Sequence, residues 1–157
     1  MKLSQQELEK LIFEKFTKHT GLHIVCFQTC NPPEPDILCE HQYGKLYFEL
    51  TDNTSEQIQK SIHANKEKIR RRAYSFSPFP EKYRQKFTKH YETHLLNCEL
   101  IIYFGVHPVA DLGDHFNNKL QENIEWIRQH INQSEFHTVW IYDYHQDRIL
   151  DQVYGRT

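Results

Sequence analysis

The sequence predicts an α/β protein in which helices cover both faces of a mixed β-sheet. Residues 45–51 (KLYFELT) alternate apolar and polar side chains with the two-residue period of a β-strand. Residues 98–105 (CELIIYFG) are almost continuously apolar, which is typical of a strand buried on both faces. Segments with apolar residues at helical spacing alternate with such strands, as in a layered α/β sandwich. The 157 residues contain no Gly/Ser-rich linker, so a single domain over residues 1–157 is expected.

The first half of the chain predicts one helix followed by three strands. Ser4 and Glu7 have the spacing of a capping box, and Gly21 is a suitable stop, so the helix is expected over about 4–19. Its apolar positions recur at helical spacing, at Leu8, Leu11, Ile12 and Phe16. Strands are expected at 21–30, 36–41 and 45–51, with a proline-rich interruption after the first and a hairpin turn near Gly44 between the last two.

The second half predicts three helices and three strands. A long helix is expected within 51–76, a second helix over 81–96 and a third within 109–132. The buried strand at 98–105 lies between the last two of these helices. Strands at 136–144 and 148–155 are expected to close the chain as a hairpin, and its polar residues at 142–148 are explained by the turn. The predicted order is α-β-β-β-α-α-β-α-β-β.

Basic residues are concentrated in one segment, although the net charge of the whole chain is only −2. Between Lys60 and Lys89 there are ten basic and two acidic residues, so this segment carries +8 and the rest of the chain −10. Such segregation favours a nucleic-acid partner, contacted mainly through its phosphates, over an ordinary solvated helix face. The residues expected to make these contacts are Lys66, Lys68, Arg70, Arg71, Arg72, Lys82, Arg84 and Lys86.

Two carboxylates are expected to meet across the predicted hairpin. With the turn near Gly44, paired residues should have numbers that sum to about 86, which places Asp36 opposite the part of the next strand that holds Glu49 and Thr51. Neighbouring side chains at such positions lie about 5–8 Å apart. Two carboxylates this close repel one another unless a cation or hydrogen bonds compensate them, and Mg²⁺ is bound in this way.

These residues resemble the signature of the PD-(D/E)xK nuclease superfamily. Pro35-Asp36 matches the first half of the motif and Glu49-Leu50-Thr51 the second, and the predicted elements from residue 4 to about 105 follow the order of the family's core. The resemblance implies a restriction-endonuclease-like α-β-β-β-α-β core with a C-terminal α-β-β extension. It also implies one or two Mg²⁺ (or Mn²⁺) ions held by Asp36, Glu49 and the carbonyl of Leu50, with hydrolysis of phosphodiester bonds.

Thr51 departs from the family pattern, which has lysine at this position. That lysine stabilises charge on the phosphate, which threonine cannot do. Some members of the family take the missing group from the following helix, and Gln57 and Lys60 are the candidates here, so the expected catalytic set is Asp36, Glu49, Thr51, Gln57 and Lys60. An acid from the first helix often joins such sites, and the sequence leaves the choice between Glu7 and Glu14 open.

The expected function is that of a magnesium-dependent endo- or exodeoxyribonuclease, acting on DNA more than on RNA. The alternative is a catalytically degenerate module on the same fold that binds nucleic acid or protein. There is no P-loop, GxGxxG or nucleophile elbow, and only five glycines are available to cradle a phosphate. A polar N-terminus and the lack of about 18 consecutive apolar residues predict a cytoplasmic protein without a membrane-spanning helix. The oligomeric state stays open, a homodimer included.

Overall fold

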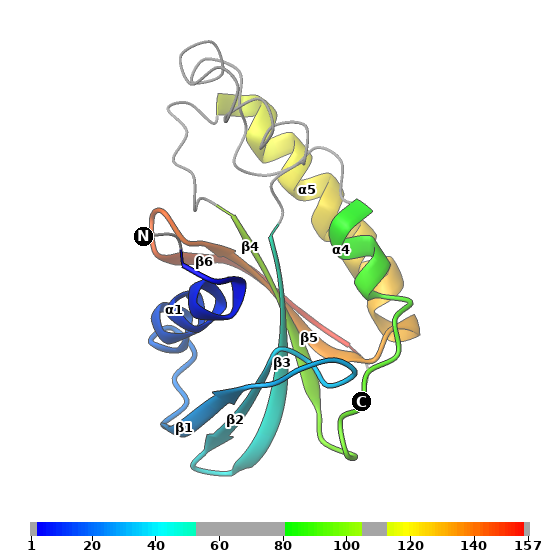
Figure 1. Ribbon diagram of the computed structural model, residues 1–157. Helices are drawn as coiled ribbons and strands as arrows, with labels where there is room; N and C mark the ends of the chain where they lie inside the picture. Colours follow the sequence, from blue (N-terminus) through cyan, green and yellow to red (C-terminus); the bar gives the residue numbers. More distant parts are fainter. Residues whose placement is uncertain (1–2, 53–80, 105–112, 156–157) are drawn as a thin grey trace.

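Figure 1 shows a computed structural model of the chain, in which α1 lies on one side of a six-stranded sheet and α4 and α5 lie on the other. The structure describes residues 3–52, 81–104 and 113–155. The helices and strands within these ranges are α1 (Gln5–Thr17), β1 (Ile24–Thr29), β2 (Ile37–His41), β3 (Gly44–Asp52), α4 (Glu81–Lys86), β4 (Cys98–Phe104), α5 (Gly113–His130), the 3₁₀ helix η1 (Ile131–Gln133), β5 (Phe136–Asp143) and β6 (Arg148–Tyr154). The prediction of an α/β protein with a mixed sheet and helices on both faces is confirmed.

The sheet has the strand order β1-β2-β3-β4-β5-β6. The first three strands form an antiparallel meander, β4 is parallel to both β3 and β5, and β6 pairs antiparallel with β5. In the β2–β3 hairpin, Ile37 pairs with Phe48 and Leu38 with Tyr47. These numbers sum to one less than the expected value, so the predicted hairpin and its register are confirmed to within one residue. The terminal hairpin of β5 and β6 is confirmed as well.

The alternation along β3 divides the protein's interior into two hydrophobic clusters. Phe48 faces the cluster beneath α1, which also holds Ile12 and Phe13 of that helix. Tyr47 belongs to the cluster on the opposite face, beneath α4 and α5. Because successive side chains of a strand point to opposite faces, Glu49 lies on the same side of β3 as Tyr47.

Helix α1 begins with the predicted capping box. The Glu7 backbone N–H donates to Ser4 Oγ over 3.1 Å, and the Ser4 N–H donates to a carboxylate oxygen of Glu7 over 3.3 Å. The buried stripe of the helix is displaced from the predicted one, because Leu11 is 41 % exposed while Phe13 is fully buried. The buried positions are Glu9, Ile12, Phe13 and Phe16.

The helix predicted over 81–96 is shorter than expected, since α4 ends at Lys86. Beyond Lys86, tertiary contacts replace the helical ladder: the Tyr91 N–H donates to Glu135 Oε2 over 2.7 Å, and the Glu92 N–H donates to the Pro33 carbonyl over 3.0 Å. His94 and Leu95 then adopt positive φ angles of 50° and 69°, which a continuing helix does not contain. The helix-like spacing of apolar residues after Lys86 arises because Phe87 and Tyr91 both pack in the hydrophobic cluster against the sheet.

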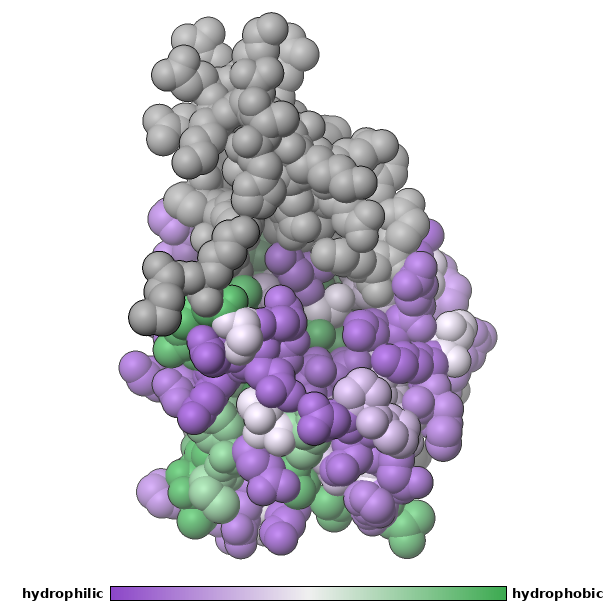
Figure 2. Space-filling view, in the orientation of Figure 1, coloured by the Kyte–Doolittle hydropathy of each residue, from purple (hydrophilic) through white to green (hydrophobic). Residues whose placement is uncertain are grey.

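The surface of the described region is mainly hydrophilic on the face drawn in Figure 2. Hydrophobic residues gather toward the lower left, where β1 and β2 lie in Figure 1. Val25 on the edge strand β1 is 61 % exposed, and Tyr43 in the turn before β3 is 80 % exposed. Among residues 3–52, 81–104 and 113–155, no helix has both the length and the apolar character required to cross a bilayer. Of the helix predicted within 51–76, Thr51 and Asp52 belong to β3, and the rest lies outside the described residues.

Candidate active site

Asp36 and Glu49 are joined across two adjacent strands by a reciprocal pair of hydrogen bonds. The Asp36 backbone N–H donates to Glu49 Oε1 over 3.1 Å, and the Leu50 N–H donates to Asp36 Oδ2 over 2.8 Å. Asp36 immediately precedes β2 and Glu49 lies within β3. The predicted encounter of these residues is therefore confirmed, and each carboxylate is held by the backbone of the other strand.

The loop that leads into Asp36 is anchored from two directions. Glu34 Oε2 accepts a hydrogen bond of 2.6 Å from the hydroxyl of Tyr47 in β3. The Cys30 N–H donates to the Asp36 carbonyl over 2.8 Å, which closes the proline-rich loop on itself. Pro35 is buried. These contacts fix the backbone at Asp36, so the position of its carboxylate is set by the sheet and not by the loop alone.

A lysine reaches this carboxylate pair from α4. Lys86 Nζ lies 3.0 Å from Glu49 Oε2, and the exposed fractions of the two side chains are 26 % and 4 %. A charge-assisted hydrogen bond of this kind is stronger than a neutral one, and more so where water is largely excluded. From the sequence, Lys86 was expected to contact nucleic acid as part of the basic segment. In the structure its ammonium group forms an ion pair with Glu49.

Glu9 is the acid of the first helix whose charge interacts with the carboxylate pair. It is 8 % exposed, and its pKa is raised chiefly by burial and further by the negative charge of Glu49, while a hydrogen bond from Gln5 opposes the rise. The two acids considered from the sequence, Glu7 and Glu14, are exposed, and Glu7 serves the capping box. Glu9 could have been found from its spacing, because it lies three and four residues before the buried Ile12 and Phe13.

The pKa of Asp36 is raised to about 8. Burial is the largest cause, followed by the neighbouring Glu49 and then Glu9, while the hydrogen bond from the Leu50 N–H opposes the rise. Three acidic side chains thus influence one another around the ammonium group of Lys86, the one cation found among them within the described ranges. Such an excess of negative potential is compensated by proton uptake or by binding a cation.

The hydroxyl of Tyr91 is a buried polar atom close to the carboxylate pair. It has no hydrogen-bond partner among the described residues. Its pKa is raised chiefly by burial, then by the charge of Glu49 and by the closeness of that carboxylate as a hydrogen-bond acceptor, and Asp36 contributes as well, so the hydroxyl lies beside Glu49 and in the field of both carboxylates. Buried polar groups are nearly always paired, so this unpaired hydroxyl near Glu49 is a candidate donor to a group bound at the site.

The residues that the family resemblance assigns to a metal ion are compatible with Mg²⁺ or Mn²⁺. Magnesium in proteins is commonly held by one or two carboxylates, with waters and substrate oxygens completing the shell. Asp36 and Glu49 supply two, and the Leu50 carbonyl lies on the backbone between Glu49 and Thr51. In the described part of the chain, no group of three or more His, Cys, Asp or Glu side chains is arranged to hold a metal ion. The fit therefore rests on the carboxylate pair, the raised Asp36 pKa and the orphan Tyr91 hydroxyl.

The other predicted site residues lie away from the carboxylate pair or outside the described residues, except Thr51, which follows it on β3. Thr51 is 6 % exposed, two residues beyond Glu49 on β3. Arg84 places its guanidinium over the ring of Trp126, 4.6 Å from the ring centroid. The Lys82 side chain lies outside the described part of the structure, and so do the residues Gln57, Lys60, Lys66, Lys68, Arg70, Arg71 and Arg72.

The polar residues of the terminal hairpin are explained by its turn. Asp143 Oδ1 accepts a hydrogen bond of 3.0 Å from the Gln146 N–H. Asp147 accepts hydrogen bonds from the hydroxyl of Tyr142 and from the ring of His19, the latter over 2.9 Å. The interpretation of residues 142–148 as a polar turn is confirmed.

Comparisons of this chain with models of protein families, with curated proteins and with solved structures found no match. Its function is therefore inferred from its own residues and their geometry.

Proposed function

We propose that this protein is a metal-dependent nuclease that hydrolyses phosphodiester bonds, in DNA more than in RNA. The observation that carries the proposal is the position of Lys86. Its ammonium donates a hydrogen bond to one oxygen of Glu49, and the other oxygen accepts a hydrogen bond from the backbone N–H of Asp36. This set combines two carboxylates with a cation, which is the chemistry of the PD-(D/E)xK motif. The lysine that the motif lacks at Thr51 is replaced by one that reaches in from α4.

The arrangement of the elements supports a restriction-endonuclease-like core. Helix α1 precedes the antiparallel meander of β1, β2 and β3, and β4 then pairs in parallel with β3. The carboxylates lie at the start of the second strand and within the third, where the motif has them. In this proposal α5, β5 and β6 extend the core at its C-terminal end.

Each residue of the site has a role in this reaction. Asp36, Glu49 and the Leu50 carbonyl would hold Mg²⁺ or Mn²⁺, and the ion when bound would neutralise phosphate charge and acidify a water molecule. Lys86 supplies positive charge beside the scissile phosphate, where negative charge develops in the transition state. Tyr91 offers a hydroxyl that can donate to the phosphate or to water. Glu9, whose pKa is raised, can hold a proton next to the carboxylate pair.

A cleavage screen tests the proposal. Wild-type protein is incubated with single- and double-stranded DNA and RNA in Mg²⁺, Mn²⁺ or EDTA, beside Asp36→Ala and the control Lys10→Ala, an exposed lysine of α1. We expect metal-dependent cleavage by the wild type and the control, and none by Asp36→Ala at unchanged circular dichroism. Equal cleavage by Asp36→Ala would refute the site.

The second candidate is a binding module that has lost catalysis on the same fold. It is favoured by the buried Thr51 at the motif position and by the lack, among the described residues, of a third acidic ligand arranged for a metal. Salt-sensitive binding of nucleic acid by the wild type, with no cleavage in any metal, is the result that selects it.

A further inference from the structure

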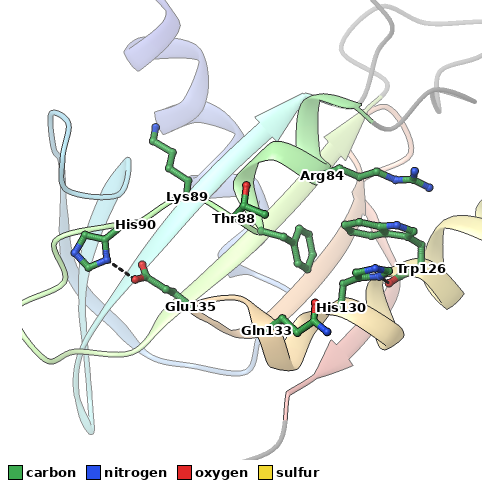
Figure 3. Close-up of a pocket in the computed structure, with 9 residues that line it drawn as sticks. Arg84, Thr88, Lys89, His90, Trp126, His130, Gln133 and Glu135 are labelled. Carbon is green, nitrogen blue, oxygen red and sulfur yellow. Dashed lines mark hydrogen bonds and ion pairs between the residues drawn. The ribbon is translucent and has the colours of Figure 1, made fainter.

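A hollow lies between the end of α4 with the turn that follows it and the C-terminal end of α5 (Figure 3). The hollow has a volume of about 400 Å³. Its lining combines aromatic rings with cationic and amide groups and one carboxylate, that of Glu135, which pairs with His90 over 2.6 Å. The lining residues used below are Arg84, Phe87, Lys89, Trp126, His130 and Gln133.

Three of these side chains form a column. The ring of His130 stacks on that of Trp126, with centroids 4.0 Å apart and an interplanar angle of 13°. The guanidinium of Arg84 lies 4.6 Å from the centroid of the same indole, and Figure 3 shows Arg84 and His130 on opposite sides of the Trp126 ring. Phe87 meets the edge of Trp126 at a centroid distance of 5.0 Å. His130 is fixed further, since its Nδ1 lies 2.7 Å from the Trp126 carbonyl. The column is therefore held in place before any ligand binds.

The turn after α4 connects this hollow to the carboxylate pair. Its backbone makes i→i+3 hydrogen bonds, including those from Phe87 to Arg84 and from Lys89 to Lys86. Side chains three residues apart eclipse one another in such a turn. Accordingly Arg84 and Phe87 both contact Trp126, whereas Lys86 contacts Glu49.

Lys89 lines the hollow and also reaches the ring of Tyr91. Its ammonium lies 5.3 Å from the centroid of the Tyr91 ring, and the hydroxyl of Tyr91 lies in the field of Glu49 and Asp36. Three cations thus lie within six residues: Arg84 and Lys89 line the hollow, and Lys86, at the end of α4, contacts Glu49. A polyanion that follows them would pass from one site to the other.

Resting on the proposed nuclease function, we propose that the hollow binds one unstacked nucleotide of a single-stranded nucleic acid. Its base extends the column on His130, where the amide of Gln133 offers both a donor and an acceptor to the base edge. The phosphates of the neighbouring nucleotides lie on Lys89 and on Arg84, which is on the opposite side of Trp126 from the base. Stacking on fixed rings beside a cationic track is the usual means of holding single strands, whereas an acidic peptide would make no use of the rings.

The first experiment measures affinity in EDTA, so that binding is separated from cleavage. A fluorescently labelled single-stranded deoxyadenosine 12-mer is titrated with wild-type protein, Arg84→Ala/Lys89→Ala, His130→Ala and the charge-matched control Lys10→Ala/Lys18→Ala on α1, and its anisotropy is recorded. We expect the pocket variants to bind about tenfold more weakly or worse and the control to bind as the wild type. For Arg84→Ala/Lys89→Ala the slope of log K against log salt should fall by about 1.4, since each phosphate contact on a single strand contributes about 0.7.

The second experiment uses Trp126 as a reporter inside the hollow. The chain has two tryptophans, so Trp140→Phe leaves Trp126 as the sole emitter. Saturable quenching by the 12-mer, without quenching by inorganic polyphosphate, supports a nucleotide in the hollow. The same quenching by polyphosphate, or pocket variants that bind with wild-type affinity, would overturn the proposal. If those variants bind normally while the wild type still cleaves DNA, the pocket assignment fails and the nuclease function stands.

Discussion

Lys86 Nζ lies 3.0 Å from Glu49 Oε2, although the two residues are 37 positions apart in the chain. The Glu49 side chain is only 4 % exposed, and its two oxygens are paired with Lys86 and with the N–H of Asp36. Removing one partner of such a pair leaves a buried charge without compensation, which is costly. The pair is therefore expected to contribute to stability as well as to the site.

Lys86→Met should lower the free energy of unfolding by about 1–3 kcal/mol at pH 7, because Glu49 loses its charged partner while the aliphatic stem is kept. Glu49→Gln in the same background should restore part of the loss. Urea denaturation of the two single variants and the double variant gives the coupling energy, which is expected to be about 0.5–3 kcal/mol for residues in contact. A coupling energy of zero would show that the ion pair contributes nothing to the fold.

The raised pKa of Asp36 makes stability depend on pH. The folded protein binds this proton more tightly than the unfolded chain, whose carboxyl titrates near 3.8, so the stabilisation is complete below that pH and is lost as the pH rises to about 8. The free energy of unfolding should fall by up to about 1.4 kcal/mol per pH unit in this window, relative to Asp36→Asn. Urea denaturation from pH 4.5 to 8.5 measures the slope. A wild-type profile parallel to that of Asp36→Asn would contradict the assignment.

Glu9→Gln should lower the pKa of Asp36, because it removes one of the negative charges that raise it. The pH-dependent loss of stability should then be complete at a lower pH than in the wild type, and its total size should be smaller. Denaturation across the same pH range detects the change, and Glu14→Gln on the exposed face of α1 is the matched control. Identical profiles for Glu9→Gln and Glu14→Gln would place Glu9 outside the electrostatics of the site.

Tyr91→Phe separates stability from function. Because the hydroxyl is buried without a partner among the described residues, its removal should leave the free energy of unfolding unchanged or raise it by up to about 1–3 kcal/mol. If the hydroxyl serves the substrate or a water, metal-dependent cleavage should fall at the same time. Thermal unfolding and cleavage rates are measured on one preparation. A variant that is destabilised and fully active would show that the hydroxyl is structural.

The short-range part of the site could be predicted from the sequence. A tight turn near Gly44 fixes the hairpin register, and the register alone brings Asp36 to Glu49. Lys86 could not be found in this way, because its contact depends on how α4 packs on the sheet, and no local pattern encodes that packing. The spacing of Glu9 to Ile12 and Phe13 places it on the buried face of α1. A sequence pattern that counts only apolar residues misses it, because an acidic residue occupies this buried position. The early end of α4 likewise depends on distant partners, Glu135 and Pro33.

The most direct test of the account is the single-turnover rate of DNA cleavage by Lys86→Ala, compared with wild-type protein and Lys10→Ala in Mg²⁺. A preorganised charge that stabilises a transition state contributes about 10²–10³-fold to the rate. We predict a loss of that size in Lys86→Ala at unchanged circular dichroism, with the wild-type rate in Lys10→Ala. Cleavage by Lys86→Ala at the wild-type rate would contradict the claim that this lysine replaces the one missing at Thr51.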